Sequence, residues 1–226
     1  MPILEPNFAD VIDPGQYGLR DAVTVARQLR EKGIPVPQRL ANALQTETDL
    51  GRAERVLEIL PHVTPRAQLV EILNQALPLT EARVRSKVWK LYVQATEDPS
   101  WALAHLDDPD PRVAANIVEA LWRSPMSEEL QKVYERAACQ PRNRVASCGV
   151  VGLLMAGGES GPAHVRRMVA SEDAAFRASG AWVIGKARWE AGRELLEPLR
   201  RDEDAKVRMN AEKSLGRLNR KLGAAL

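Results

Sequence analysis

The chain has 226 residues, of which 45% are hydrophobic and only 4% are aromatic. This composition suits a thin stack of helices packed through Leu, Val and Ala better than a core filled with large rings. The net charge of +2 gives no global field that would point to nucleic acid or a membrane. Cys139 and Cys148 form no CxxC pair, which argues against a disulfide framework or a zinc site. The N-terminus has no basic segment and no long apolar run, so we expect no signal peptide, no transmembrane span and a cytoplasmic location.

The first quarter of the chain is predicted to be helical but irregular. Residues 1–15 are rich in proline and are expected to form a loose arm. Helices are expected over 17–32, 37–46 and 49–60, and the last of these should end before Pro61. These segments do not follow the spacing found later in the chain, as is expected for the terminal cap of a repeat protein.

From Thr64 onward the apolar pattern predicts pairs of helices, each with a first (A) and a second (B) member. The A helices are expected at 65–77, 99–106, 127–138, 161–170 and 190–200. The B helices are expected at 81–95, 111–123, 142–156, 174–187 and 205–221. Asp110, which precedes Pro111, and Asp204 should cap two B helices, because a carboxylate there accepts from the free N–H groups of the first turn.

The B helices repeat one another. Equivalent apolar stripes begin about 31 residues apart, at Val84, Val113, Val145, Phe176 and Val207. Four residues after each start, the last three copies carry small residues, Gly149, Gly180 and Ala211, which predicts a close approach of the paired A helix. Glycine inside a helix costs about 1 kcal/mol relative to alanine, so a glycine that recurs at one position should be offset by closer packing. Gly185 and Gly216 are therefore expected to admit a neighbouring backbone.

Two copies share a detailed pattern, V-R-x-x-A-x-x-S-L-G at 207–216 and F-R-x-x-G-x-x-V-I-G at 176–185. The pattern resembles the HEAT-like repeats named after phycobilisome lyases, and the resemblance extends over residues 64–221. Ala114 and Ala146 replace the arginine in two other copies.

The resemblance implies an all-α, right-handed solenoid of helical hairpins whose B helices line the concave surface. We therefore predict an N-terminal arm and helical cap at 1–63, and one continuous solenoid at 64–226. The family also implies a range of roles: many members bind proteins, a few attach bilins, and a distantly related helical-repeat group removes damaged DNA bases.

Three features could suggest catalysis or metal binding, and each has a simpler interpretation. The glycine-rich segment 157–161 lacks the following lysine and the preceding strand of a phosphate-binding loop. Asp107 and Asp108 stand near Asp110, but prolines interrupt the group and Asp110 suits a helix cap. Cys148 is expected to be a small buried hydrophobe. The sequence therefore predicts no enzyme, no cofactor and no metal site.

Four of the five tryptophans fall off the apolar stripes of the B helices, on a face that we predict to bind a partner. The predicted binding residues are Trp89, Lys90, Glu119, Trp122, Val151, Leu154, Trp182, Trp189 and Lys213. Trp122, Val151 and Trp182 belong to consecutive B helices about 10 Å apart, so they would form an apolar strip about 20 Å long. Lys90 and Lys213 would stand at its ends and set the orientation of the partner. A second interpretation, in which these tryptophans pack against the next repeat, stays open.

The predicted function is a non-enzymatic scaffold that binds a partner helix or peptide on the concave B-helix surface. One alternative is a nucleic-acid binder like the helical-repeat DNA glycosylases, which would need a basic groove, aromatic residues and a nearby carboxylate. Glu119 is the only acid at the position that it shares with Lys90, Val151, Trp182 and Lys213, and the weak net charge argues against this alternative. The other alternative, a protein related to bilin lyases, rests on the name of the repeat alone. The sequence leaves the identity of the partner and the oligomeric state open.

Overall fold

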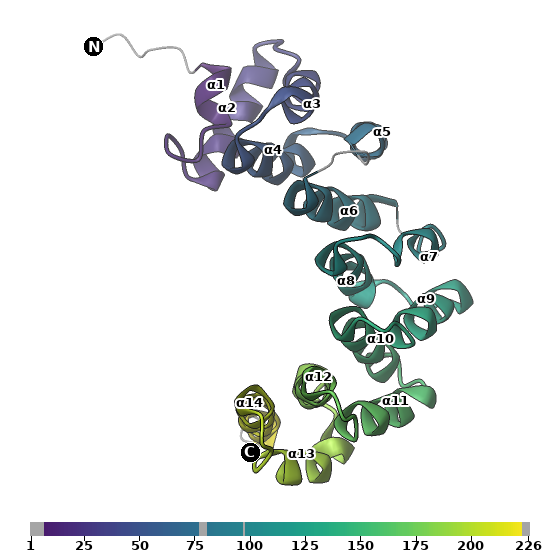
Figure 1. Ribbon diagram of the computed structural model, residues 1–226. Coiled ribbons are helices and arrows are strands. Elements are labelled where there is room, and N and C mark those ends of the chain that lie inside the picture. Colours follow the sequence, from purple (N-terminus) through teal and green to yellow (C-terminus); the bar gives the residue numbers. More distant parts are fainter. Residues whose placement is uncertain (1–6, 77–80, 97, 223–226) are drawn as a thin grey trace. The chain divides into compact units, whose positions relative to one another are not determined.

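The computed structural model describes residues 7–76, 81–96 and 98–222, and within these ranges every regular element is a helix. The prediction of an all-α chain is confirmed to that extent. The chain divides into two compact units, Met1–Glu97 and Asp98–Leu226, which are described separately below (Figure 1). The predicted boundary after residue 63 lies inside the first unit, and the single solenoid from residue 64 stays a prediction.

The first unit contains six helices in its described part. They are α1 (Phe8–Val11), α2 (Leu19–Glu31), α3 (Val36–Thr46), α4 (Leu50–Val63), α5 (Arg66–Ala76) and α6 (Ala82–Thr96). Helix α4 lies at the centre, in contact with α2, α3, α5 and α6. Its apolar side fills the core with Val56, Leu57 and Leu60, which are almost completely buried.

Two expectations for the first unit need correction. The arm was expected to be irregular, yet residues 8–11 form a short helix that is capped by Asn7 and buries Val11 completely. Helix α4 was expected to end before Pro61, yet it continues to Val63. Proline in a last turn removes a single backbone hydrogen bond, and the buried side chain of Val63 favours continuation. Residues 1–6 of the predicted arm and residue 77 of the predicted A helix lie outside the described residues.

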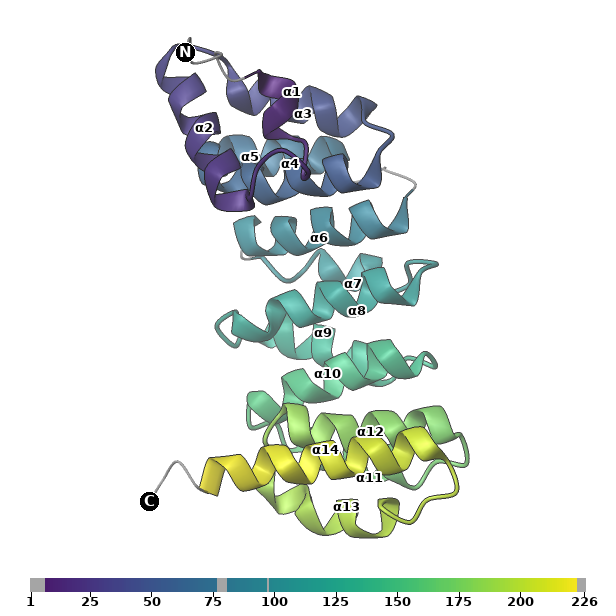
Figure 2. The same ribbon diagram turned by 90° about the vertical axis from the view of Figure 1, so that its left-hand side faces the viewer.

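The second unit consists of two layers of helices (Figures 1 and 2). The A layer contains α7 (Ala102–His105), α9 (Glu128–Ala138), α11 (Ser160–Val169) and α13 (Arg193–Leu199). The B layer contains α8 (Pro111–Ala120), α10 (Asn143–Met155), α12 (Ala174–Lys186) and α14 (Ala205–Leu222). Short 3-10 helices, η1 (Leu121–Arg123) and η2 (Glu190–Gly192), extend α8 and precede α13. Within the B layer α10 packs against α8 and α12, and α12 packs against α14, while α9, α11 and α13 pack against α10, α12 and α14.

The element boundaries of the second unit follow the sequence pattern closely. The two predicted caps are confirmed: the carboxylate of Asp110 accepts from the backbone N–H of Arg112 at 2.8 Å, and that of Asp204 accepts from Lys206 at 2.8 Å. The main departure is α7, which is a single turn where a helix over 99–106 was expected.

Glycine permits the close contacts on which the two layers depend. A Cβ atom at Gly149 would lie 2.5 Å from the backbone nitrogen of Ala138 in α9. At Gly180 it would lie 2.8 Å from Cγ1 of Val169, at the end of α11, and at Gly185 it would lie 2.7 Å from Cα of Ser214. The predicted burial of Gly149 and Gly180 between A and B helices is therefore confirmed, and so is the close approach at Gly185.

Gly216 does not follow this rule. A Cβ atom there would meet nothing within 4 Å, so the expectation that Gly216 admits a neighbouring backbone is wrong. On the same side of α14, Glu212 takes the place of the fully buried Ala181 of α12, and its carboxylate accepts from Arg200 at 2.7 Å. This side of α14 is therefore charged and carries an ion pair, unlike the buried equivalent position of α12.

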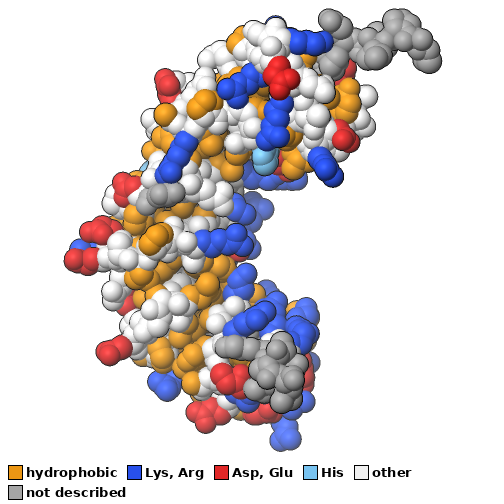
Figure 3. Space-filling model, turned by 180° about the vertical axis from the view of Figure 1, so that it is seen from behind, with side chains coloured by type: hydrophobic (Ala, Val, Ile, Leu, Met, Phe, Trp, Pro, Cys, Tyr) orange, Lys and Arg blue, Asp and Glu red, His pale blue; other side chains and the backbone are white. Residues whose placement is uncertain are grey.

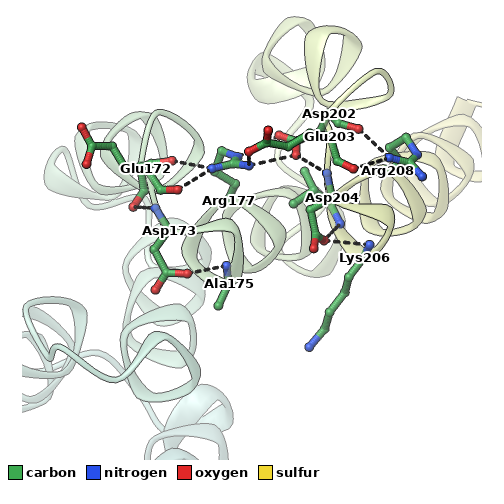
Figure 4. Close-up of polar contacts among 11 residues, drawn as sticks. Glu172, Asp173, Ala175, Arg177, Asp202, Glu203, Asp204, Lys206 and Arg208 are labelled. Atoms are coloured by element: carbon green, nitrogen blue, oxygen red, sulfur yellow. Dashed lines mark hydrogen bonds and ion pairs between the residues drawn. The ribbon is translucent and has the colours of Figure 1, made fainter.

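The arginine of the repeated pattern holds the loop that precedes its own helix (Figure 4). Arg177 donates to the backbone carbonyls of Ser171 and Glu172, and Arg208 donates to those of Asp202 and Glu203, one repeat later. The donor and its acceptors thus recur with the same spacing in two copies.

The same arginine also connects one repeat to the next. The guanidinium of Arg177 donates to both carboxylate oxygens of Asp202, at 2.8 and 3.0 Å, and both side chains are about nine-tenths buried. In the copies with Ala114 and Ala146 in place of the arginine, Arg142 instead donates to the backbone carbonyls of Leu106 and Asp108.

We expect opposite effects from one methyl group at two glycines. Gly149→Ala should lower the free energy of unfolding by about 1–3 kcal/mol, because the methyl group meets backbone atoms that cannot move aside cheaply. Gly216→Ala should raise it by about 1 kcal/mol, because the site is open and alanine favours the helix. Urea unfolding of both variants measures the difference. Equal effects of the two substitutions would show that helix propensity alone decides.

We also expect a pH-dependent effect at Asp202. Its hydrogen bonds from Arg177 hold the pKa of the Asp202 carboxyl below its usual range. The stability that this contributes is present above about pH 4, the ordinary pKa of aspartate, and is lost as the pH falls through the lower folded value. Asp202→Asn should therefore lower the melting temperature at pH 7, and the deficit should shrink as the pH falls below about 4. Glu203→Gln is the control, since Glu203 is 88% exposed. A deficit at Asp202 that stays constant with pH would contradict the assignment.

Candidate interaction surface

Two tryptophans from separate helices of the B layer meet over the helix between them. Trp122 comes from η1, at the end of α8, and Trp182 comes from α12; their ring centroids lie 6.5 Å apart, with 39° between the planes. The indole N–H of Trp122 donates to the backbone carbonyl of Cys148 in α10 at 3.0 Å. Because α10 packs between α8 and α12, the two rings lie across its outer surface. Both side chains are half-buried, so part of each ring faces solvent.

A lysine and a glutamate complete this cluster. The Nζ atom of Lys186 lies 4.9 Å from the ring centroid of Trp122, within the range of a cation–π contact. The same atom lies 4.0 Å from the carboxylate of Glu119 in α8. Trp122, Trp182, Lys186 and Glu119 therefore form one fixed group, which we call the tryptophan cluster.

The surface around the tryptophan cluster is basic. Helices α10 and α12 contain no Asp or Glu, and the only acid of α14, Glu212, is bound to Arg200. Several cations of the B layer have no carboxylate partner among the described residues, among them Arg123, Arg144, Lys206, Lys213 and Arg217. In the A layer, by contrast, Lys132 and Arg136 pair with Glu128 and Asp107. Lys and Arg side chains gather over the part of the second unit that carries α14 (Figure 3).

The predicted apolar strip does not exist in the expected form. Val151, its central residue, is completely buried, and Trp122 and Trp182 meet instead of lying about 20 Å apart. The cause is their size, because the two rings reach over α10 from both sides. Trp89 is also buried, with 4% of its surface exposed, and packs edge-on against Tyr92 in the first unit. Trp89 and Val151 are therefore structural residues.

The other predicted binding residues divide into two groups. Lys90, Glu119 and Lys213 are exposed, as expected, although Lys90 belongs to the first unit. Leu154 and Trp189 are half-buried, and each packs against a glycine, Gly161 and Gly192 respectively. Only Glu119, Trp122, Trp182 and Lys213 therefore remain candidates on the B-layer surface.

Of the unpaired cations of the B layer, Lys213 was predicted from the sequence, and Arg123, Arg144, Lys206 and Arg217 were not. The net charge of the chain hides the difference between the two layers. The signal that would have revealed them is the lack of any acid in 143–155 and 174–186, beside a terminal helix with a single Glu.

Two groups that resemble reactive sites have structural roles. Burial raises the pKa of the Cys148 thiol to about 12, so the thiol stays protonated at neutral pH and packs as a hydrophobe, as predicted. In the A layer, Ser160 and His164 both contact the carboxylate of Glu135 and not each other. This trio joins α9 to α11.

Over the described ranges, no group of three or more His, Cys, Asp and Glu side chains is placed to hold a metal ion. Within the same ranges, none of the helices combines the length and the hydrophobicity needed to cross a bilayer. Of the three neighbouring aspartates, Asp107 accepts from Gln140, Asp108 accepts from the backbone N–H of Asp110, and Asp110 caps α8.

Comparison with known proteins gives little beyond the helical architecture. No family model matches the chain, and no curated protein matches it. Two engineered proteins of known crystal structure are similar to it. The first is 15% identical with a TM-score of 0.41; the match covers 89% of this chain, which spans 62% of the length of that protein. The second is 16% identical with a TM-score of 0.34, covering 94% of this chain and 96% of the other. At these TM-scores the likeness carries no argument about function.

Proposed function

We propose that the protein is an interaction scaffold and that the outer surface of the B layer in its second unit binds a partner protein. The observation that supports this most directly is the tryptophan cluster. It keeps two aromatic rings partly in contact with solvent, and it fixes them through the Trp122–Cys148 hydrogen bond and the Lys186 contact. Tryptophans in such positions are enriched among the residues that dominate protein–protein affinity, and rings that are already fixed lose little entropy on binding.

The recurring contacts support a wider proposal about architecture. Arg177 and Arg208 hold equivalent loops, and Asp173 and Asp204 cap equivalent helices, 31 residues apart. We propose that these pairs belong to HEAT-like repeats of a right-handed solenoid that begins near residue 64. In such a stack the B helices would line the concave surface, where a helix or an extended peptide can contact several repeats at once.

The alternative function, a nucleic-acid binder like the helical-repeat DNA glycosylases, is less well supported. Its carboxylate would have to be Glu119, which is held by Lys186. One face of Trp122 is occupied by Lys186 and Trp182 lies close beside it, so an extruded base would have to break an existing cluster.

Replacing Trp182 tests the proposed function. Peptides that bind the wild-type protein would first be selected from a displayed library of random peptides. Trp182→Ala should then weaken the selected peptides by about 2 kcal/mol or more, which is roughly a 30-fold rise in Kd. The matched control is Trp189→Ala, because Trp189 is also half-buried but packs against Gly192 near α13.

Thermal unfolding of both variants separates lost binding from lost folding. The control should lose stability while its affinity stays within about twofold of wild type, a difference of roughly 0.4 kcal/mol. Peptides that bind the folded Trp182→Ala variant as tightly as wild type would rule out the tryptophan cluster as the docking site.

A further inference from the structure

Cations of the B layer occupy two equivalent positions along its helices and form two rows, in which Arg217 is half-buried and the others are exposed. Arg144 and Lys206 precede the apolar stripes of α10 and α14, close to the N-terminal ends of these helices. Arg123, Lys186 and Arg217 lie towards the C-terminal ends of α8, α12 and α14. Arg112 shares the first row, but it is bonded to Asp110.

The two rows share one face of the layer. Lys206 and Arg217 are eleven residues apart in α14, and eleven residues make slightly more than three turns at about 3.6 residues per turn. At 1.5 Å per residue the rows are therefore about 16 Å apart along the helix axes. Trp182 precedes Lys186 by one turn of α12, and Trp122 lies beside the second row, with Lys186 over its ring. Lys213 stands in α14 between Lys206 and Arg217. The face thus offers an aromatic pair next to the second row, with the first row farther along the helix axes.

These charges have no carboxylate to balance them within the described part of the chain. Arg123, Arg144, Lys206, Lys213 and Arg217 make no ion pair there, although Asp and Glu are abundant in the loops. Exposed cations that share a face repel one another weakly, so a ligand with complementary charge binds with relief of that repulsion as well as with attraction.

We infer that the partner is an acidic amphipathic segment of another protein, which lies across the B helices between the two rows of cations. This inference rests on the proposed function and specifies the chemistry of the partner. An α-helix is about 10–12 Å in diameter with its side chains, so it fits between rows about 16 Å apart. Its apolar side would cover the exposed edges of Trp122 and Trp182, and carboxylates on its two flanks would reach the rows.

Two other occupants fit the surface less well. A second copy of this chain would have to offer acidic side chains, and several of those in its loops are already engaged. Asp110 and Asp204 cap helices, and Asp202 is held by Arg177. A single-stranded nucleic acid would need open aromatic faces on which bases can stack, and the Trp122 face is occupied by Lys186.

The test uses a fluorescein-labelled peptide of about 18 residues with Leu and Glu at helical spacing, and its fluorescence anisotropy on titration with the full chain. A peptide with Gln in place of every Glu is the neutral probe, and a labelled oligothymidylate is the nucleic-acid probe. The double variant R144E/R217E reverses one charge in each row. R166E/R201E is the matched control, with the same change of net charge at exposed residues outside the B layer.

We expect the acidic peptide to bind the wild-type protein and the control equally, and R144E/R217E at least 10-fold more weakly. Binding should also weaken steeply when NaCl rises from about 50 to about 300 mM, because salt screens exposed charges. Circular dichroism establishes that each variant is folded. Equal binding of the Glu and Gln peptides would overturn the inference, and so would equal loss in the two double variants. If the oligothymidylate binds more tightly than the acidic peptide, and this binding is lost in R144E/R217E, the partner is a nucleic acid and not an acidic protein.

The experiments distinguish failure of the acidic-partner inference from failure of the proposed scaffold function. If peptides selected from the random library depend on Trp182 but carry no excess of acid, the scaffold stands and the acidic partner is wrong. If no peptide binds through Trp182, the proposed function fails together with the inference.

Discussion

Gly185 brings α14 so close to α12 that one added methyl group would lie 2.7 Å from the Cα atom of Ser214. Gly149 allows an equally close approach of α10 and α9. Packing at this distance requires glycine at the points of contact, while larger side chains such as Tyr134 and Ile184 fill the core around them. The charged residues of α10 and α12, which are Arg144, Arg177 and Lys186, lie near the ends of these helices.

The tryptophan cluster adds a contact that nearest-neighbour packing does not provide. In repeat proteins each unit mainly contacts the next one, yet here Trp122 of the α8 segment meets Trp182 of α12 across α10. The cluster thereby ties three successive B helices into one surface. Its half-exposed rings are held before any partner arrives, which distinguishes a preformed docking site from loose aromatic side chains that order on binding.

Many helix boundaries and close contacts could be predicted from the sequence, because helix caps and small residues act within a few residues of their own position. Asp110 and Asp204 predict the starts of α8 and α14, which they cap. Gly149, four residues after the start of its apolar stripe, predicts the close approach of α9. The same logic fails at Gly216, where the repeated glycine has no neighbour. A repeated motif predicts the packing role of a position, but it does not show whether a neighbouring helix lies against that particular copy.

The surface was harder to predict, because it depends on side chains that reach across helices. Projection of each helix on its own places Val151 on the outer face, and it cannot show that rings from α8 and α12 cover that face. The direction of Trp122 also changes where α8 tightens into η1. Ser124 must be extended before Pro125, which ends the helix, and a 3-10 turn has 3.0 residues instead of 3.6.

The central claim is that the outer surface of the B layer is the docking site, and NMR mapping tests it most directly. A protein labelled with ¹⁵N would be titrated with the unlabelled acidic peptide, and the amide and indole signals followed. We expect the largest shift changes at the indole of Trp182 and at the amides of Arg144 and Lys213, while Trp101 and the amides of α9 stay unchanged. Changes centred on α9 and α11, with Trp182 unaffected, would contradict the account and place the site on the opposite layer.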